Sequence, residues 1–533
     1  MQIIHGERRF SMNRPRIILA SVCAVVCCAS LAACGNGGNS ANGGQGVKTL
    51  TEDMTYSLSS MDPQRAFEAT GYEVNHSVYE TALTFKGDDL TKVIPSVCTY
   101  KMSADNTVLT LTLNGTHKFS DGKPVTVDDI VFSYQRLQGI KGNPSYLLDG
   151  VTVKKVDDKS LTLTAEQSMP ELPTILPSPP LGIVEKSVVE RHGGTTDTKD
   201  GAEKYLTDHS VGSGPYMYDT VSTDSSITLK RNPYYTGSKP YFDRVVVNNV
   251  TSSSQKINLE GGNADIAEDI TESEASKLDT AKFTKTEGES LSTWFLDFNT
   301  YEKNSGIAAN QDFVSAMKHS INYKKIIEQI GSGTKAPASL IPFSIAGALK
   351  SDDNLVYDTA KAKAYLAKSG YDGSEVRLLY SDEVAHLREV AQLVQADAKA
   401  VGINIKLDPQ TDANRLSQSR EHKYQIAISN WGADYPDPAN YLAFVPLDKA
   451  DDAHDWAYGE SKTADEIKPY VDAAKNASGN KRPKAYEDLM HKMDEVGPYI
   501  PLYQPANFVM GKSSLKGITY NGIWNLAYAD ISE

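Results

Sequence analysis

The sequence has few of the residue patterns that enzymes and thiolate metal sites require. Its 533 residues include only 5 cysteines and 10 histidines. The histidines form no His-x-x-x-His pair, and the chain contains no Gly-x-Ser-x-Gly elbow. A zinc site of the usual spacing and a nucleophilic serine of the α/β-hydrolase type are therefore not indicated.

Positive charge is also scarce. Lys and Arg number 54 against 68 Asp and Glu, which gives a formal net charge of −14. So acidic a chain argues against nucleic acid as a partner and against loose electrostatic adhesion to anionic lipid. The remaining composition is that of a soluble globular protein, with 40% hydrophobic and 23% charged residues. Because 533 residues exceed a single hydrophobic core, two or more lobes are expected.

The N-terminus differs from the rest of the chain. Four arginines precede an apolar run from Ile17 to Ala33, which predicts a secretory signal over residues 1–33 rather than a membrane span. The ending Leu-Ala-Ala-Cys resembles a bacterial lipobox, and this resemblance implies cleavage before Cys34 and lipidation of its sulfur. Residues 34–47, rich in Gly, Asn and Ser, are expected to form a flexible tether. The alternative is a plain secretory signal, in which Cys34 has no role.

Removal of that signal changes the charge and the cysteine content. The mature chain has 50 Lys and Arg against 67 Asp and Glu, a net charge of −17. Cys23, Cys27 and Cys28 leave with the signal, and Cys34 would carry lipid. Only Cys98 remains, so the mature chain cannot form a disulfide framework or a thiolate metal site. We expect Cys98 to be a small buried apolar residue.

The stretch from His117 to Arg136 carries the clearest local signals. Residues 107–113, just before it, alternate in a way that predicts a half-buried strand. Asp121-Gly122 is a pair that tolerates positive φ in a turn. Thr126, with Asp129 three residues later, predicts a capping box at the start of a helix.

This stretch resembles the most recognisable segment of the extracellular solute-binding proteins of peptide-type ABC importers, solute-binding family 5. The matching residues are Phe119, Asp121, Gly122, Pro124, Thr126, Asp128 and Asp129. Val127 stands where alanine is usual, and Lys101 stands where a tryptophan is usual. Residues 212–216 and 231–235 match further family segments, and the resemblance extends over residues 48–533.

The resemblance implies an α/β fold of the two-lobed periplasmic-binding-protein type II (Venus flytrap, cluster C), with an extra subdomain in the first lobe. We expect the first lobe over residues 48–290, with the inserted subdomain at about 82–208. The second lobe is expected over residues 291–504, and residues 505–533 should return to the first lobe.

The candidate ligand site follows a predicted strand, Tyr424 to Ser429. The loop after it contains Asp434 between aromatic residues, and such a carboxylate can bind an ammonium group through charge and cation–π attraction. The resemblance implies that Asp434 receives the α-amine of a peptide and that the strand end pairs with the peptide backbone. The expected ligand-binding residues are Asn430, Trp431, Gly432, Asp434 and Tyr435, together with Phe67, Glu68, Ala69 and Thr70 at the start of the chain. The alternative makes Asp434 a turn residue and Trp431 part of the core.

The resemblance therefore implies a substrate-binding lipoprotein that captures oligopeptides or dipeptides and delivers them to an ABC permease and its ATPase. We expect a monomer, anchored through Cys34 on the extracytoplasmic face of the cell membrane, without enzymatic activity, cofactor, metal or nucleic acid. Oligosaccharides and nickel- or haem-type ligands stay open as alternatives for the same fold. A lipoprotein that senses or adheres, and a secreted hydrolase, are the alternatives from other classes.

Overall fold

The structure is a computed structural model of the chain. The residues it describes are 46–351, 355–384, 386–446, 456 and 462–533. The expected signal over residues 1–33 and the expected lipid site at Cys34 lie outside the described residues, as does most of the expected tether. Residues 47–533 form one compact unit.

The turn and helix after His117 fold as the sequence predicts. Gly122 has a φ of +91°, which is the left-handed conformation that the turn requires. The helix α2 (Val127–Gly139) begins with a complete capping box. The Thr126 hydroxyl accepts from the Asp129 N–H, and the Asp129 carboxylate accepts from the Thr126 N–H at 2.9 Å. Both predictions are confirmed.

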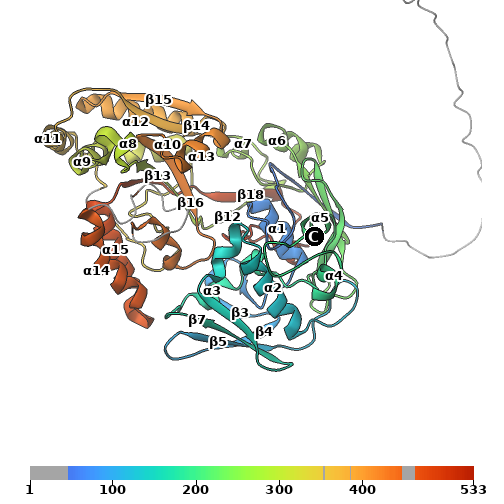
Figure 1. Ribbon diagram of the computed structural model, residues 1–533. Coiled ribbons are helices and arrows are strands. Elements are labelled where there is room, and N and C mark those ends of the chain that lie inside the picture. The colour runs from blue at the N-terminus through green and yellow to red at the C-terminus, as the bar shows by residue number, and fades with distance from the viewer. Residues whose placement is uncertain (1–45, 352–354, 385, 447–455, 457–461) are drawn as a thin grey trace, which may run out of the picture. The chain divides into compact units, whose positions relative to one another are not determined.

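Helix α2 packs on a small antiparallel sheet. Its strand order is β4-β5-β7-β6, from β4 (Cys98–Met102), β5 (Val108–Leu113), β7 (Ser160–Ala165) and β6 (Val151–Lys155). Leu109 and Leu111 of β5 and Ile130 and Leu137 of α2 are fully buried in the same apolar cluster, so the alternation of the strand does set its buried face. Cys98 is also fully buried. We call residues 82–208 the small-sheet region; its colour runs from light blue to teal in Figure 1.

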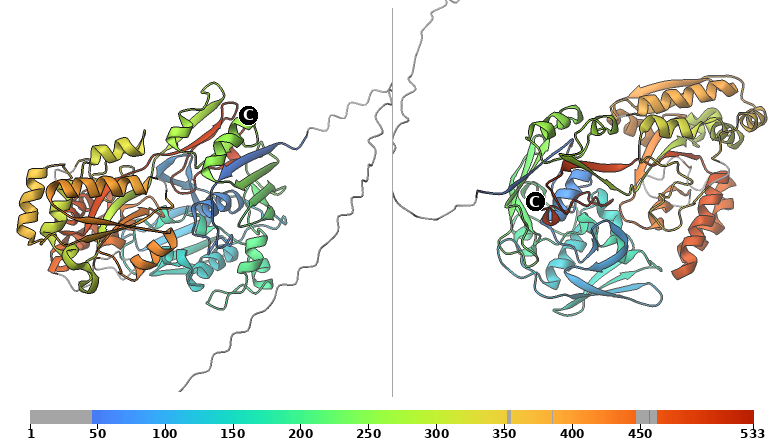
Figure 2. Two further views of the ribbon diagram at one scale, coloured as in Figure 1. Left: turned by 90° about the horizontal axis from the view of Figure 1, so that it is seen from above. Right: turned by 180° about the vertical axis from the view of Figure 1, so that it is seen from behind.

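A seven-stranded sheet joins segments that are far apart in the sequence. Its order is β12-β18-β11-β1-β10-β9-β8. The strands are β12 (Phe283–Gly288), β18 (Asn507–Lys512), β11 (Ile266–Ala267), β1 (Thr49–Met54), β10 (Arg244–Asn249), β9 (Ser226–Arg231) and β8 (Tyr216–Val221). Strand β1 is parallel to β10 and β11, while the C-terminal strand β18 pairs with β12 and β11 (Figure 2). This sheet, with the small-sheet region, is the first lobe.

Helix α1 (Ala69–Val78) covers part of this sheet, and the close approach of its last residue requires a glycine at position 212. Val74 and Val78 of α1 share one buried cluster with Leu50, Val245 and other strand residues. Gly212 passes so close to the end of α1 that a β-carbon there would lie 2.2 Å from the Val78 carbonyl oxygen. The glycine pair after Val211 is therefore required by backbone packing.

The second lobe is built on a five-stranded sheet of order β15-β14-β16-β13-β17. The strands are β15 (Ile405–Gln410), β14 (Val376–Ser381), β16 (Ile426–Gly432), β13 (Ser292–Phe298) and β17 (Tyr499–Tyr503). Strand β14 is parallel to β15 and β16, and β13 is antiparallel to β16 and β17. The helices α9 (Gln311–Ser320), α11 (Thr359–Ser369) and α12 (Leu387–Val401) supply buried residues to the core of this sheet (Figure 1).

The remaining described elements connect or cover these sheets, and α15 among them adds buried residues to the core. They are β2 (Leu83–Lys86), β3 (Asp89–Pro95), α4 (Lys186–Arg191), α5 (Glu203–Asp208), α6 (Ser252–Gly261), α7 (Glu272–Ala275), α8 (Glu302–Ser305), α10 (Tyr323–Ile330), α13 (Asp412–Arg420), α14 (Lys462–Asn476) and α15 (Arg482–Val496). The 3₁₀ turns are η1 (Asn143–Leu148), η2 (Pro179–Leu181), η3 (Gly306–Ala309), η4 (Pro438–Phe444), η5 (Gly479–Lys481) and η6 (Tyr528–Asp530). Among the described residues, no helix combines the length and the apolar character needed to span a bilayer.

Two local expectations differ from the structure. Five prolines from Met169 to Pro180 predict an irregular segment, but the structure forms the one-turn helix α3 (Leu172–Ile175) there. Proline is compatible with this helix because Pro173 stands at its first turn, where no backbone N–H is needed. The sequence predicts a long helix from Glu383 to Ala400, but α12 begins only at Leu387, because His386 before it takes a φ of +66°.

Candidate ligand-binding site

Strand β16 carries the predicted binding segment farther than the sequence indicates. The predicted strand ended at Ser429, but Asn430, Trp431 and Gly432 are its last three residues. They pair with β13 along one edge, in a ladder that reaches Gly432↔Ser292. On the other edge, the β14 ladder ends at Ala427. The end of β16 therefore projects beyond β14, and this leaves sheet geometry suited to an added strand.

Asn440 fixes the turn after β16. Its side-chain oxygen accepts from the Trp431 indole N–H and from the Asp434 backbone N–H, both at 3.2 Å. Asn440 is 4% exposed, so these bonds are shielded from water. The Trp431 ring also makes an edge contact with Phe444, with 5.6 Å between the centroids. Trp431 is thus partly a packing residue, and its bond to Asn440 helps to set the conformation of the chain after β16.

The Asp434 carboxylate meets the small-sheet region. The Tyr146 hydroxyl, on η1, donates to Asp434 Oδ2, and the Ser178 hydroxyl donates to the Asp434 carbonyl oxygen at 2.9 Å. Asp434 is half-buried, while Tyr146 keeps 36% of its surface exposed. Partial desolvation, together with the negative charge of Asp434, raises the pKa of the Tyr146 hydroxyl. Asp434 therefore lies where the two lobes meet.

Tyr72, on α1, reaches the same place from the first lobe. Its side chain is 7% exposed, and its hydroxyl has no hydrogen-bond partner among the described residues. Burial raises the pKa of Tyr72, and the charges of Asp434 and Glu68 raise it further. The hydroxyl thus lies in the field of both carboxylates, and such a group is available to a ligand.

The other predicted residues take different environments. Phe67 is half-buried and makes an edge contact with the Tyr72 ring at 6.2 Å. Glu68 accepts from the Ser59 hydroxyl at 2.6 Å and precedes the first helical residue, Ala69, which is exposed. Thr70 is 5% exposed.

Tyr435, in contrast, belongs to the apolar core. It is 7% exposed, in a cluster that also contains Leu176 of the small-sheet region. Of the predicted residues, the structure brings the end of β16 and Asp434 close to α1, through Tyr72. It turns Thr70 and Tyr435 inward.

A second polar contact joins the lobes near Asp434. Arg482 donates to Asp437 at 2.7 Å and to Glu171 of the small-sheet region at 3.1 Å. Burial, and then the charge of Asp437, raise the pKa of Glu171 to about 6, although Arg482 opposes this shift. Asp437 lies three residues after Asp434, so this contact also joins the second lobe to the small-sheet region.

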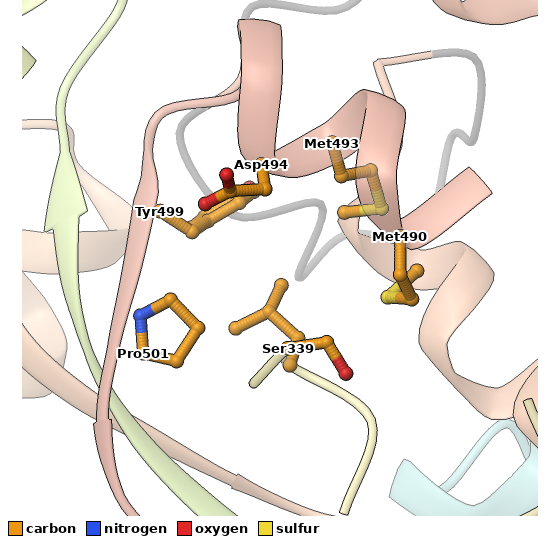
Figure 3. A pocket seen from close by; sticks show the side chains of 7 residues that line it. Ser339, Met490, Met493, Asp494, Tyr499 and Pro501 are labelled. Atoms are coloured by element: carbon orange, nitrogen blue, oxygen red, sulfur yellow. The ribbon is translucent and has the colours of Figure 1, made fainter. Parts of the chain in front are cut away.

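The small pocket in Figure 3 lies elsewhere in the second lobe. Its lining consists of Ser339, Leu340, Met490, Met493, Asp494, Tyr499 and Pro501. Its carboxylate, Asp494, accepts from the Lys318 ammonium group at 2.6 Å in a buried ion pair. Because that charge is already neutralised, this pocket offers a weaker anchor for a charged ligand than Asp434 does.

Sequence reasoning did not predict Tyr146, Ser178 or Asn440. Each lies far from Asp434 or beyond the expected motif, and no local pattern marks it. Tyr72 had a usable signal, because it follows Glu68 by four residues and so lies on the same side of the helix.

Comparison with known proteins finds relatives along most of the chain. The chain is 25% identical over 474 residues to the probable D,D-dipeptide-binding periplasmic protein DdpA of Escherichia coli K12, covering 87% of this chain and 89% of the relative. It is 25% identical over 494 residues to heme-binding protein A of Haemophilus influenzae, with coverages of 85% and 87%. The structure of DppA from Helicobacter pylori in complex with the peptide STSA has a TM-score of 0.76 at 22% identity, covering 91% and 97% of the two chains. This likeness confirms the two-lobed periplasmic-binding-protein fold.

The family description "Bacterial extracellular solute-binding proteins, family 5 Middle" matches residues 92–451. This segment is more than half of the chain. Proteins of this family are substrate-binding, non-enzymatic components of transporters, which confirms the expectation that the chain is not an enzyme. The chain therefore belongs to family 5 of the bacterial extracellular solute-binding proteins.

Proposed function

We propose that this chain is the peptide-binding component of an ABC importer and that Asp434 receives the amino group of the peptide. The observation that carries the proposal is the half-buried Asp434 carboxylate, held by Tyr146 beside the Tyr72 hydroxyl. An ammonium group can pair with this carboxylate and lie against the aromatic rings. The names of the relatives agree, since DdpA is described as dipeptide-binding and the DppA structure holds a peptide.

The end of β16 supports recognition of the peptide backbone. Residues 430–432 extend past the β14 ladder, so a peptide can add along them as a further strand. Backbone hydrogen bonds recognise what all peptides share, whatever their side chains. Phe67 and Glu68, just before α1, and Ala69, its first residue, would then line the opposite side of the bound peptide, with Tyr72 one turn farther along.

The first experiment identifies the ligand. Mass spectrometry of the protein as purified should detect co-purified peptides with free amino termini. Haem, a nickel complex or an oligosaccharide in their place would overturn the peptide proposal. After the ligand is removed by unfolding and refolding, calorimetry measures the affinity for a synthetic peptide of the identified sequence and for its N-acetylated form.

The second experiment tests the role of Asp434. Asp434→Asn removes the charge at nearly constant size, and acetylation removes the charge of its partner. We expect each change to weaken binding by about 100-fold, equivalent to about 3 kcal/mol, because each leaves one charge buried without a partner. Both together should cost little more than either alone. Asp465→Asn, on the exposed face of α14, makes the same charge change and should leave affinity unaltered. Unchanged affinity in Asp434→Asn would remove the assignment.

We also propose that residues 1–33 are a signal and that Cys34 carries lipid, which would tether the protein outside the cell membrane beside its permease and ATPase. The lipobox-like ending and the polar residues after it support this. Labelled palmitate should enter the wild type and not Cys34→Ser, and the variant should be released from membranes. We further propose that the first lobe covers residues 48–290 and 505–533 and that the second covers residues 291–504. We also propose that the protein is a monomer, which light scattering tests.

A further inference from the structure

Three glutamates meet inside the first lobe. Glu52 lies in β1, Glu268 directly follows the neighbouring parallel strand β11, and Glu73 lies on α1. One carboxylate oxygen of each lies within 4.8 Å of the others. Glu52 and Glu73 are 0% exposed, and Glu268 is half-buried. We call these residues the glutamate triad.

Hydrogen bonds account for only part of the triad. The Tyr528 hydroxyl donates to Glu52 Oε2 at 2.6 Å, and the Asn525 amide donates to Glu268 Oε1. The other oxygen of each, together with both oxygens of Glu73, is buried and accepts no hydrogen bond from the described residues, although Glu52, Glu268 and Tyr528 are polar neighbours of Glu73. A fully buried carboxylate with two such oxygens is costly unless something else binds them. Glu73 therefore points to a ligand held by the triad.

The charge of the triad indicates the sign of that ligand. The charged groups that act most strongly on the three carboxylates are one another, Asp53 and Asp269, and all are acidic. The four carboxylate oxygens without a partner thus face one another in an acidic surrounding, so the ligand that would offset this charge is a cation.

We propose that the glutamate triad binds a divalent cation and that Ca²⁺ is its preferred ion. The unpartnered atoms are four carboxylate oxygens, which are the ligands that hard cations prefer. Ca²⁺ fits better than Mg²⁺ because it accepts irregular oxygen shells and loses water more readily. Tyr528 and Asn525 would act from outside, each holding one carboxylate so that its other oxygen faces the ion.

The bound ion would join separate parts of the first lobe. Its ligands come from β1, α1 and the end of β11, and the outer hydrogen bonds add the C-terminal segment. Because Glu73 and Tyr72 are neighbours on α1, the ion would also fix the helix that reaches Asp434. The cation site itself does not depend on the identity of the transported ligand.

Ion binding is tested on the mature protein after dialysis against EDTA. Calorimetry with CaCl₂ should show one site per chain, and Ca²⁺ at about 100 to 1,000 times its Kd should raise the melting temperature by about 3–4 °C. Terbium bound in the same site should luminesce when tyrosine is excited, and Ca²⁺ should displace it. Absence of binding by Ca²⁺ and Mn²⁺ in the wild type would overturn the proposal.

Variants locate the site. In Glu73→Gln and in Glu268→Gln, Ca²⁺ should no longer raise the melting temperature. Because Glu268 is only half-buried, its variant provides the test if Glu73→Gln does not fold. Glu260→Gln, exposed on α6, is the matched control and should keep the shift. A calcium shift that persists in Glu268→Gln would overturn the assignment. The proposal would also be overturned if the three glutamates simply share protons. In that case Glu73→Gln would raise the melting temperature without metal, and Ca²⁺ would not change the melting temperature of the wild type.

Discussion

Arg482→Met tests the charged contact that joins the small-sheet region to the second lobe. The guanidinium group lies between Asp437 and Glu171, at 2.7 and 3.1 Å, and its carbon is 5.0 Å from the centre of the Tyr486 ring. The side chains of Arg482 and the two acids are at most 15% exposed. Water therefore hydrates the two carboxylates poorly once the guanidinium group is removed.

The expected cost follows from that burial. Methionine keeps the apolar contact with Tyr486 but leaves Asp437 and Glu171 without their cation. Breaking a buried pair in this way typically costs about 3–5 kcal/mol. We expect the free energy of unfolding to fall by about 3 kcal/mol, measured by urea unfolding at pH 7.5 and followed by circular dichroism.

Two comparisons make this measurement specific. The double variant Arg482→Met, Glu171→Gln should recover part of the loss, because one of the two unpaired charges is gone. Arg388→Met removes an arginine whose side chain is 53% exposed and paired with Asp382, so it should cost less than about 1 kcal/mol. If Arg482→Met costs no more than Arg388→Met, the contact does not stabilise the fold and the reasoning is refuted.

Three further predictions use single residues. Tyr72→Phe should weaken peptide binding by about 10-fold and leave stability within about 1 kcal/mol, because its hydroxyl has no partner among the described residues; calorimetry and urea unfolding check this, and unchanged affinity contradicts it. The pKa of Glu171 is raised to about 6, so the contribution of Glu171 to stability should be complete below pH 4.5 and should decline by about 2 kcal/mol as the pH rises through 6. The difference in free energy of unfolding between the wild type and Glu171→Gln, measured against pH, checks this, and a difference that grows with pH contradicts it. Burial raises the pKa of the Cys98 thiol to about 12, so in Cys34→Ser protein a thiol reagent at pH 8 should label Cys98 only after urea is added, whereas rapid labelling of the folded chain would contradict its burial.

Local structure was predictable where neighbouring residues determine it. Thr126 and Asp129 are three positions apart, and the capping box needs no other part of the chain. The alternation around Leu109 likewise predicted the buried face of β5. The start of α12 was missed because the pattern of apolar residues continues through His386, whose positive φ interrupts the helix.

The site was only partly predictable, because its partners are distant in sequence. The resemblance to the family indicated Asp434, but Tyr146 lies 288 residues away and meets it only through the packing of the lobes. The glutamate triad was missed for the same reason. Absence of a His-x-x-x-His or thiolate pattern excluded familiar metal motifs, but it could not exclude three acids delivered by separate elements.

The order of strands in the first lobe bears on the proposed export of the chain. Strand β1 is made early in synthesis, but β18, on the far side of the two-residue strand β11, is made almost last. The sheet cannot close until β18 has left the ribosome, and such distant pairings form slowly. Delayed closure would keep the chain extended for longer, which is the form in which the proposed signal would deliver it to a membrane channel.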